Sequence, residues 1–154
     1  MVDISKMVSN HNLRNFDYME TKKNLNNYFM NLEILEWELA KMNARRGLSM
    51  QFNFEDEYRK YPYSPIGKDM FNLSAIDNKE EQLKEFISSY FWAKNSVSEK
   101  ERLYIVESFA SKKSDDEIVE LLGMNSSDSN EFRKLKRSAL YKFADFLKLL
   151  VEKQ

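Results

Sequence analysis

Five basic residues gather in one short segment near the end of this 154-residue chain. Residues 129–142 hold these five and a single acidic residue, a net charge of +4, and the five are Arg133, Lys134, Lys136, Arg137 and Lys142. In protein–DNA complexes Arg pairs with guanine, Asn with adenine, and Lys with the phosphate backbone. The chemistry that these residue types offer is therefore noncovalent recognition of a polyanion.

The spacing within this segment is typical of an amphipathic helix that begins near Ser129. Apolar residues at positions 132, 135, 139 and 143 recur in steps of three and four and are expected to face the core. The opposite face is expected to carry Asn130, Arg133, Lys134, Arg137 and Tyr141. Because the major groove admits one helix, we expect Arg133 and Arg137 to reach base edges, and Asn130 to read adenine.

A second, shorter helix is expected directly before this one. It spans residues 115–122, ends at Gly123 and is followed by the polar segment 124–128. A short helix, a turn with glycine and a longer helix form the helix-turn-helix pattern, which we place at about 114–143. The longer helix would then be the one that reads duplex DNA.

Further residues are assigned to the phosphate backbone. Four lie on or beside the reading helix, namely Ser127, Lys134, Lys136 and Lys142. Lys113, next to Lys112, is interpreted either as one more phosphate contact or as part of a solvated loop. Residues 98–128 carry four basic and eight acidic residues, a net charge of −4. Charge is therefore sharply separated between the supporting segment and the reading helix.

Residues 96–147 resemble the C-terminal promoter-binding domain of bacterial sigma factors, and more closely the ArpU-type phage late-transcription regulators. The likeness rests on three sets of residues, at 98–102, at 114–118 with 121–124, and at 132–143. It implies a sigma-like helix-turn-helix and a transcriptional regulator of phage or mobile-element type, with RNA polymerase or another phage or host protein as partner. This chain departs from the family in its longer turn and in the acidic residues Asp128 and Glu131, which would repel phosphate.

An apolar heptad pattern predicts a long helix in the N-terminal part of the chain. It begins near Thr21, and its apolar residues are Leu25, Tyr28, Leu32, Leu35, Leu39 and Met42. Two interpretations of this seam stay open, a bundle helix that packs on its own chain and a coiled coil that joins two copies in a homodimer. Residues 1–16 have no clear period and are expected to form a loose arm or a short helix.

The chain divides into three regions, all without strand signals. Residues 1–47 hold the arm and the long helix, and residues 48–76 form an aromatic connection with both prolines. Residues 77–154 hold four helix starts, each an N-cap residue followed by Glu three positions later: Asp77, Ser98, Ser114 and Asp128. The expected fold is all-α, a long N-terminal helix with a C-terminal helical bundle.

The composition excludes most catalytic chemistry. The chain has no cysteine and one histidine, His11, which we interpret as a surface residue. Thiolate nucleophiles, disulfides and Cys/His metal sites are therefore absent, and we expect neither an enzyme nor a cofactor nor a metal site. The acidic residues at 115–117 are interpreted as helix-dipole partners. Without a signal peptide or an apolar run of about 20 residues, a cytoplasmic protein is expected.

Two rival functions are compatible with the same residues. One is a protein-binding adaptor that keeps a sigma-like fold but has lost DNA binding, which the acidic turn and the net charge of −1 favour. The other is a phage packaging accessory factor similar to small terminase subunits, which also carry helix-turn-helix domains. The leading interpretation remains a regulator that binds double-stranded DNA.

Overall fold

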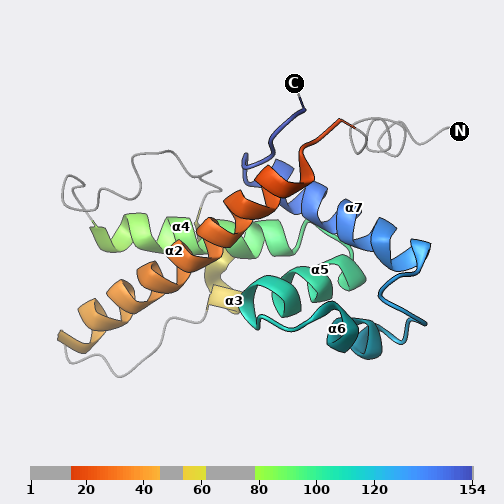
Figure 1. Cartoon of the computed structure of the whole chain (residues 1–154). Helices are drawn as coiled ribbons and strands as arrows, with labels where there is room; N and C mark the ends of the chain where they lie inside the picture. The colour runs from red at the N-terminus through yellow and green to blue at the C-terminus, as the bar shows by residue number, and fades with distance from the viewer. Residues whose placement is uncertain (1–14, 46–53, 62–78, 154) are drawn as a thin grey trace, which may run out of the picture.

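The computed structural model describes residues 15–45, 54–61 and 79–153, so that His11, both prolines and Asp77 lie outside the described residues. The helices are α2 (Tyr18–Arg45), α3 (Phe54–Glu57), α4 (Lys79–Lys94), α5 (Glu99–Ile105), α6 (Asp115–Leu122) and α7 (Asn130–Phe146), with the 3-10 turn η1 (Tyr58–Lys60) and the π-helical turn η4 (Val106–Ala110). The described residues form no strand, which confirms the expected all-α class with a long N-terminal helix. In Figure 1, α2 runs diagonally across α4 toward α7.

Serine side chains begin the helices of the C-terminal part. Ser98 and Glu101 form a complete capping box: Ser98 Oγ accepts from the Glu101 N–H at 3.3 Å, and Glu101 Oε1 accepts from the Ser98 N–H at 3.0 Å. Ser114 Oγ accepts from the Glu117 N–H at 3.3 Å. Each such cap stabilises a helix by about 1 kcal/mol. These two predicted helix starts are confirmed.

The start of α7 differs by one residue from the expected one. Ser129, and not Asp128, is the N-cap, and its Oγ accepts from the Phe132 N–H at 3.2 Å. Asp128 lies inside a tight turn, in which the Ser129 N–H donates to the Ser126 carbonyl at 3.2 Å. The turn brings Ser129 into capping position, and α7 begins at Asn130.

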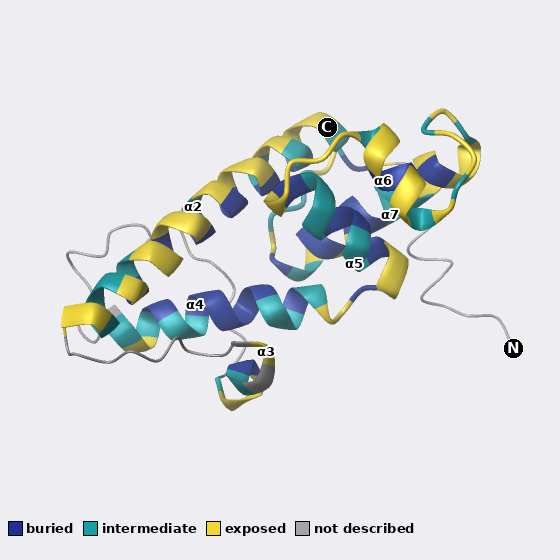
Figure 2. Ribbon diagram, turned by 90° about the horizontal axis from the view of Figure 1, so that it is seen from below, coloured by how far each residue is buried: buried dark blue, intermediate teal, exposed yellow. Residues whose placement is uncertain are grey.

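The heptad seam of α2 is buried inside the molecule. Leu25, Tyr28, Leu32, Leu35 and Leu39 are all buried, and Met42 packs against the same core. The seam faces α4 and α7, whereas the outer side of α2 is largely exposed (Figure 2). The interpretation as a bundle helix that packs on its own chain is confirmed. The alternative of a coiled-coil dimer through this seam is wrong, because the side chains that would form the dimer interface are buried within the same chain.

Aromatic rings from four elements meet in the centre of the core. The ring of Phe29 on α2 stacks on Phe109 of η4 at 5.5 Å and on Phe143 of α7 at 5.9 Å between centroids. Tyr90 of α4 meets Phe29 edge to face at 5.5 Å. Pairs of this kind contribute about 0.5–1.5 kcal/mol each beyond the burial of their area. The N-terminal helix and the C-terminal helices therefore share one core.

In two helices the apolar spacing along the sequence does not match the residues that are buried. After α5, the Ser111 N–H donates to the Val106 carbonyl at 3.0 Å, a π-type bond that adds one residue to the turn. The spacing of Leu103, Val106 and Phe109 predicts a core stripe, but Leu103 is half-buried. Tyr104 and Ile105 are fully buried instead. A sequence period of 3.6 residues cannot anticipate such a change of register.

On α6, the spacing of Ile118, Leu121 and Leu122 predicts three core residues, but Leu121 is 53% exposed. Val119 is buried beside Ile118 instead. Only one narrow side of this short helix lies against the core. Positions 118, 119 and 122 share that side, because 122 follows 118 by four residues and 119 by three. Leu121 therefore points outward.

The two ends of the described chain lie side by side. The Asp17 N–H donates to the Val151 carbonyl at 2.7 Å, and the Lys153 N–H donates to the Asn15 carbonyl at 2.6 Å. Between them Phe16 and Glu152 form an isolated antiparallel bridge. The segment after α7 thus fixes the start of α2 beside the end of α7. This placement decides which part of α7 is accessible.

Candidate nucleic-acid interface

The turn between α6 and α7 depends on the backbone conformation of Gly123. Its φ is +69°, in the left-handed region that residues with a Cβ rarely adopt. A Cβ built there would meet nothing within 4 Å, so the conformation and not a lack of space favours glycine. The Met124 N–H then donates to the Val119 carbonyl at 3.0 Å and closes the end of α6. This is the short helix, glycine turn and longer helix that the sequence predicts.

Two polar contacts hold α6 against the turn and α7. Ser127 Oγ donates to Asp116 Oδ1 at 2.7 Å, and Lys136 Nζ lies 2.7 Å from Asp115 Oδ2. Asp115 and Asp116 stand in the first turn of α6, where their charges also favour the helix dipole. The sequence predicts that Ser127 and Lys136 bind phosphate. In the structure both side chains instead hold α6 in place.

Three of the predicted DNA contacts, all in the first two turns of α7, have free side chains. Asn130, Arg133 and Lys134 are exposed, and within the described part of the chain their side chains form no hydrogen bond or ion pair. Their separations of three and four residues place them on one side of the helix. The N-terminal end of α7 is therefore the accessible basic surface of the helix-turn-helix.

The remaining cations of the predicted site have partners in the protein. Lys142 Nζ lies 3.2 Å from Glu101 Oε2, and Lys113 Nζ lies 2.8 Å from Glu107 Oε2. The hydrogen bond that Lys113 donates to Glu107, and the negative charge of Glu107, raise the pKa of Lys113. Lys142 and Lys113 stay partly exposed, so that a phosphate would have to share each of them with a carboxylate.

Arg137 and Tyr141 lie beneath the start of α2. The Arg137 guanidinium stands over the rings of Phe16 at 5.0 Å and Tyr18 at 5.6 Å, within the range of a cation–π contact. Tyr141 is buried and meets Phe16 edge to face at 5.5 Å. The expected polar face of α7 is therefore wrong at Tyr141, because the N-terminal segment packs over this part of the helix.

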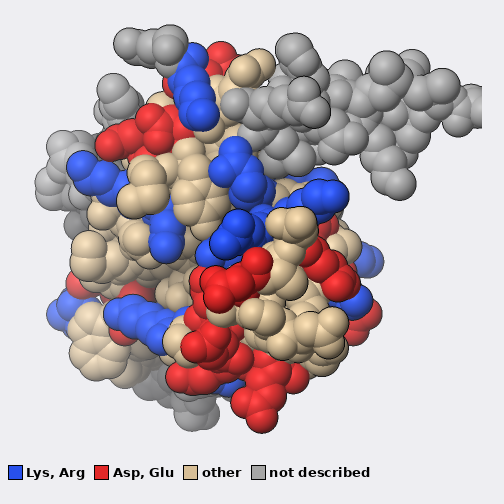
Figure 3. All heavy atoms as spheres, turned by 45° about the vertical axis from the view of Figure 1, so that its right-hand side comes forward, with Lys and Arg blue, Asp and Glu red and all other residues tan. Residues whose placement is uncertain are grey.

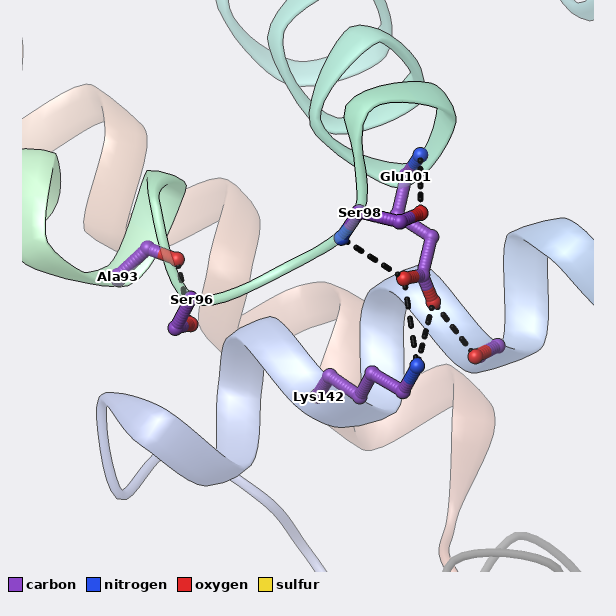
Figure 4. A network of polar contacts seen from close by, with 6 residues as sticks. Ala93, Ser96, Ser98, Glu101 and Lys142 are labelled. Carbon is purple, nitrogen blue, oxygen red and sulfur yellow. Dashed lines mark hydrogen bonds and ion pairs between the residues drawn. The ribbon is translucent and has the colours of Figure 1, made fainter. Parts of the chain in front are cut away.

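Glu101 is a buried carboxylate that connects the start of α5 to α7, a role that its position in a capping box did not reveal (Figure 4). Ser138 Oγ donates to Glu101 Oε2 at 2.6 Å, in addition to the contacts with Ser98 and Lys142. Burial alone would raise the pKa of Glu101, but the hydrogen bonds from Ser138 and Ser98 and the charge of Lys142 outweigh it and lower this pKa. An ionised Glu101 therefore fixes the orientation of α7.

Acidic side chains border the accessible basic surface. Figure 3, which shows the side of the molecule with the helix-turn-helix, has a band of basic side chains directly next to an acidic patch. The acidic residues Asp115, Asp116 and Glu117 stand in the first turn of α6, and Glu131 stands in the first turn of α7. The separation of charge expected from the sequence is present, but the two regions are adjacent in space.

An open groove of about 510 Å³ lies beside the exposed N-terminal end of α7. It runs between the start of α5 and α7, and Lys100 and Lys134 line it together with Glu99 and Glu131. The groove thus offers a mixed-charge recognition surface.

Within the residues that the structure describes, no group of three His, Asp or Glu residues is placed to hold a metal ion. No described helix has the length and apolarity to cross a membrane.

No family model, no curated protein and no solved structure matches this chain. The function is therefore argued from the geometry and charge of the site itself.

Proposed function

We propose that this protein binds duplex DNA through the first two turns of α7 and acts as a transcriptional regulator of phage or mobile-element type. The observation that carries the proposal is the free set of Asn130, Arg133 and Lys134 at the exposed start of the second helix of a helix-turn-helix. In proteins with this motif, the N-terminal residues of that helix contact base edges in the major groove. The geometry thus supports a smaller reading surface than the sequence suggests.

Each of the three side chains has a definite chemical role in this proposal. Arg133 pairs with the O6 and N7 atoms of guanine, and Asn130, one turn earlier, reads N6 and N7 of adenine. Lys134 binds a phosphate at the edge of the groove. Arg137, Lys136 and Lys142 lie farther along the helix and act mainly through the aromatic and acidic partners that hold α7 in place.

The nearby acids set the expected strength of binding. Glu131 and the acidic first turn of α6 repel phosphate, and few cations are free to neutralise it. The slope of log K against log salt is about −0.9 for each phosphate neutralised, so we expect a slope of about −2 to −3. Binding of random duplexes is therefore weak, and a specific site depends on base contacts.

A fluorescence anisotropy titration tests the proposal. A labelled random duplex is titrated with the full chain at about 50 mM salt and again at higher salt. A duplex carrying the preferred site, obtained by selection from a random pool, is then compared between wild type and Arg133→Ala. We expect Arg133→Ala to weaken the specific complex by about 1–3 kcal/mol.

The matched control is Lys60→Ala, which removes an exposed cation of η1 outside the helix-turn-helix. This variant should bind like wild type. If the wild-type chain shows no salt-dependent binding, or if Arg133→Ala and Lys60→Ala bind equally, the proposal is overturned.

A protein-binding adaptor is the second candidate, and the internal pairing of the basic residues favours it. Lys113, Lys136 and Lys142 each have a carboxylate partner, and the exposed Leu121 on α6 adds an apolar contact point. An adaptor of this kind would retain RNA polymerase in a pull-down and bind no duplex at low salt. Loss of that retention in Leu121→Asp, with DNA binding absent, would support the adaptor.

A further inference from the structure

The outer side of α2 carries a second apolar stripe that nothing in the described structure covers. Met19, Met30, Ile34 and Trp37 are 72%, 58%, 53% and 64% exposed. At about 100° per residue these four positions fall within one narrow sector of the helix. The sector lies about half a turn away from the buried seam, on the side of α2 that is exposed in Figure 2. An exposed stripe of large apolar residues is typical of an interaction surface.

We propose that this stripe joins two copies of the chain in an antiparallel dimer with its two-fold axis beside Met30. Positions 19, 23, 26, 30, 34, 37 and 41 follow one another in steps of three and four, as in a coiled-coil seam. In an antiparallel pair centred on Met30, Met30 meets its own counterpart, and each other position of the set meets a different position of the same set. The stripe is therefore complementary to itself, as a two-fold interface requires.

The distribution of charge along α2 favours this arrangement. Lys23 lies on the stripe in the N-terminal half of the helix, and its side chain has no partner within the described residues. In the pair centred on Met30, Lys23 faces the ring of Trp37 of the second copy. A cation–π contact thus lies on each side of the axis.

Parallel pairing of the same stripe is disfavoured by the same charges. It would place Lys23 against its own counterpart and Lys41 against its own, because both residues lie on the stripe. Like charges directly opposite each other destabilise an interface. The charge pattern therefore selects the antiparallel orientation, and the proposal does not depend on whether the chain binds DNA.

Cysteine cross-linking tests the register, because the native chain has no cysteine. Met30→Cys places two thiols beside the proposed axis, so mild oxidation should convert most of this variant to a disulfide-linked dimer. Ala44→Cys, an exposed residue in the last turn of α2, is the control. In an antiparallel pair the two Ala44 positions are about 40 Å apart, and this variant should stay unlinked. Equal cross-linking of both variants would overturn the antiparallel register.

Sedimentation equilibrium measures the dimer itself. Ile34→Asp should weaken the dimer by about tenfold or more, because it places a charge in the centre of the apolar stripe. Leu121→Asp is the matched control, since Leu121 is equally exposed at 53% but lies on α6. Lys23→Glu should weaken the dimer about three- to tenfold, because it replaces the cation over the Trp37 ring of the second copy with an anion.

Circular dichroism checks that each variant stays folded, which we expect for substitutions at exposed positions. A wild-type chain that remains a monomer up to about 1 mM overturns the proposal and leaves the stripe to a different protein partner. Equal weakening by Ile34→Asp and Leu121→Asp also overturns it, and so does a Lys23→Glu variant that dimerises like wild type.

Discussion

The two halves of α7 differ in what surrounds their basic residues. At the start of the helix Arg133 and Lys134 are exposed and free, whereas farther along Lys136 is paired with Asp115 and Lys142 with Glu101. The sequence spacing of these cations is regular, and only the neighbouring elements distinguish them. The first half is therefore suited to an external partner, and the second half belongs to the scaffold that orients it. Substitutions in the two halves should accordingly affect different properties.

The largest expected effect is a loss of stability from the buried half. Phe143→Ala removes a fully buried ring that stacks on Phe29, and we expect the free energy of unfolding to fall by about 3–5 kcal/mol. Urea denaturation followed by circular dichroism measures this change. Phe146→Ala, at a half-buried position of the same helix, should cost clearly less. Equal losses would mean that the end of α7 is not packed as described.

Glu101→Gln tests the carboxylate that joins α5 to α7. At pH 7 we expect a loss of about 1–3 kcal/mol, because the buried site loses its charge and one of its accepting oxygens. The folded state lowers the pKa of Glu101 from its ordinary value of 4.5, so the ionised group stabilises the fold above this pH. As the pH falls below about 4.5, wild type should lose this contribution and the variant should not.

Denaturation curves at pH 7 and at pH 3 measure the difference between the two proteins. Glu99→Gln, on the exposed neighbour in the same helix turn, is the control and should change stability little at either pH. A difference between wild type and Glu101→Gln that does not shrink at low pH would contradict the assigned role of the charge.

Gly123→Ala tests the turn that separates the supporting helix from the reading helix. The positive φ of 69° should cost alanine about 1–2 kcal/mol, although its Cβ would have free space. Asparagine tolerates this conformation better, so Gly123→Asn should destabilise the protein less than Gly123→Ala. Thermal denaturation ranks the two variants. An alanine variant as stable as wild type would show that the turn can adopt another conformation.

The smallest effects should separate two neighbouring lysines of α7. Lys136→Ala loses the ion pair with Asp115 and should cost at most about 1 kcal/mol of stability. Lys134→Ala should leave stability unchanged and reduce the salt dependence of DNA binding by about one phosphate. Denaturation measures the stability of both variants, and anisotropy titrations measure the salt dependence of their DNA binding. The comparison between the halves of α7 fails if the two lysines behave alike.

Local features of the fold were predictable because their causes lie within a few residues. The caps at Ser98 and Ser114, the end of α6 at Gly123 and the apolar seam of α2 all follow from residue types at fixed spacings. The burial of Tyr141 was not predictable, since its partner Phe16 lies at the opposite end of the chain. The π-turn after α5 also escaped prediction, because it depends on how Tyr104 and Ile105 pack.

The sequence by itself determined an all-α fold, the helix boundaries set by capping, and the presence of a basic helix after a glycine turn. Only the tertiary structure decided which basic residues remain free. Lys142 pairs with Glu101, 41 residues earlier, and Lys136 pairs with Asp115, 21 residues earlier. Burial and ion pairing depend on segments that folding brings together, whereas helix caps and helix faces depend on neighbours along the chain. The accessible surface of α7 is therefore a property of the packed molecule.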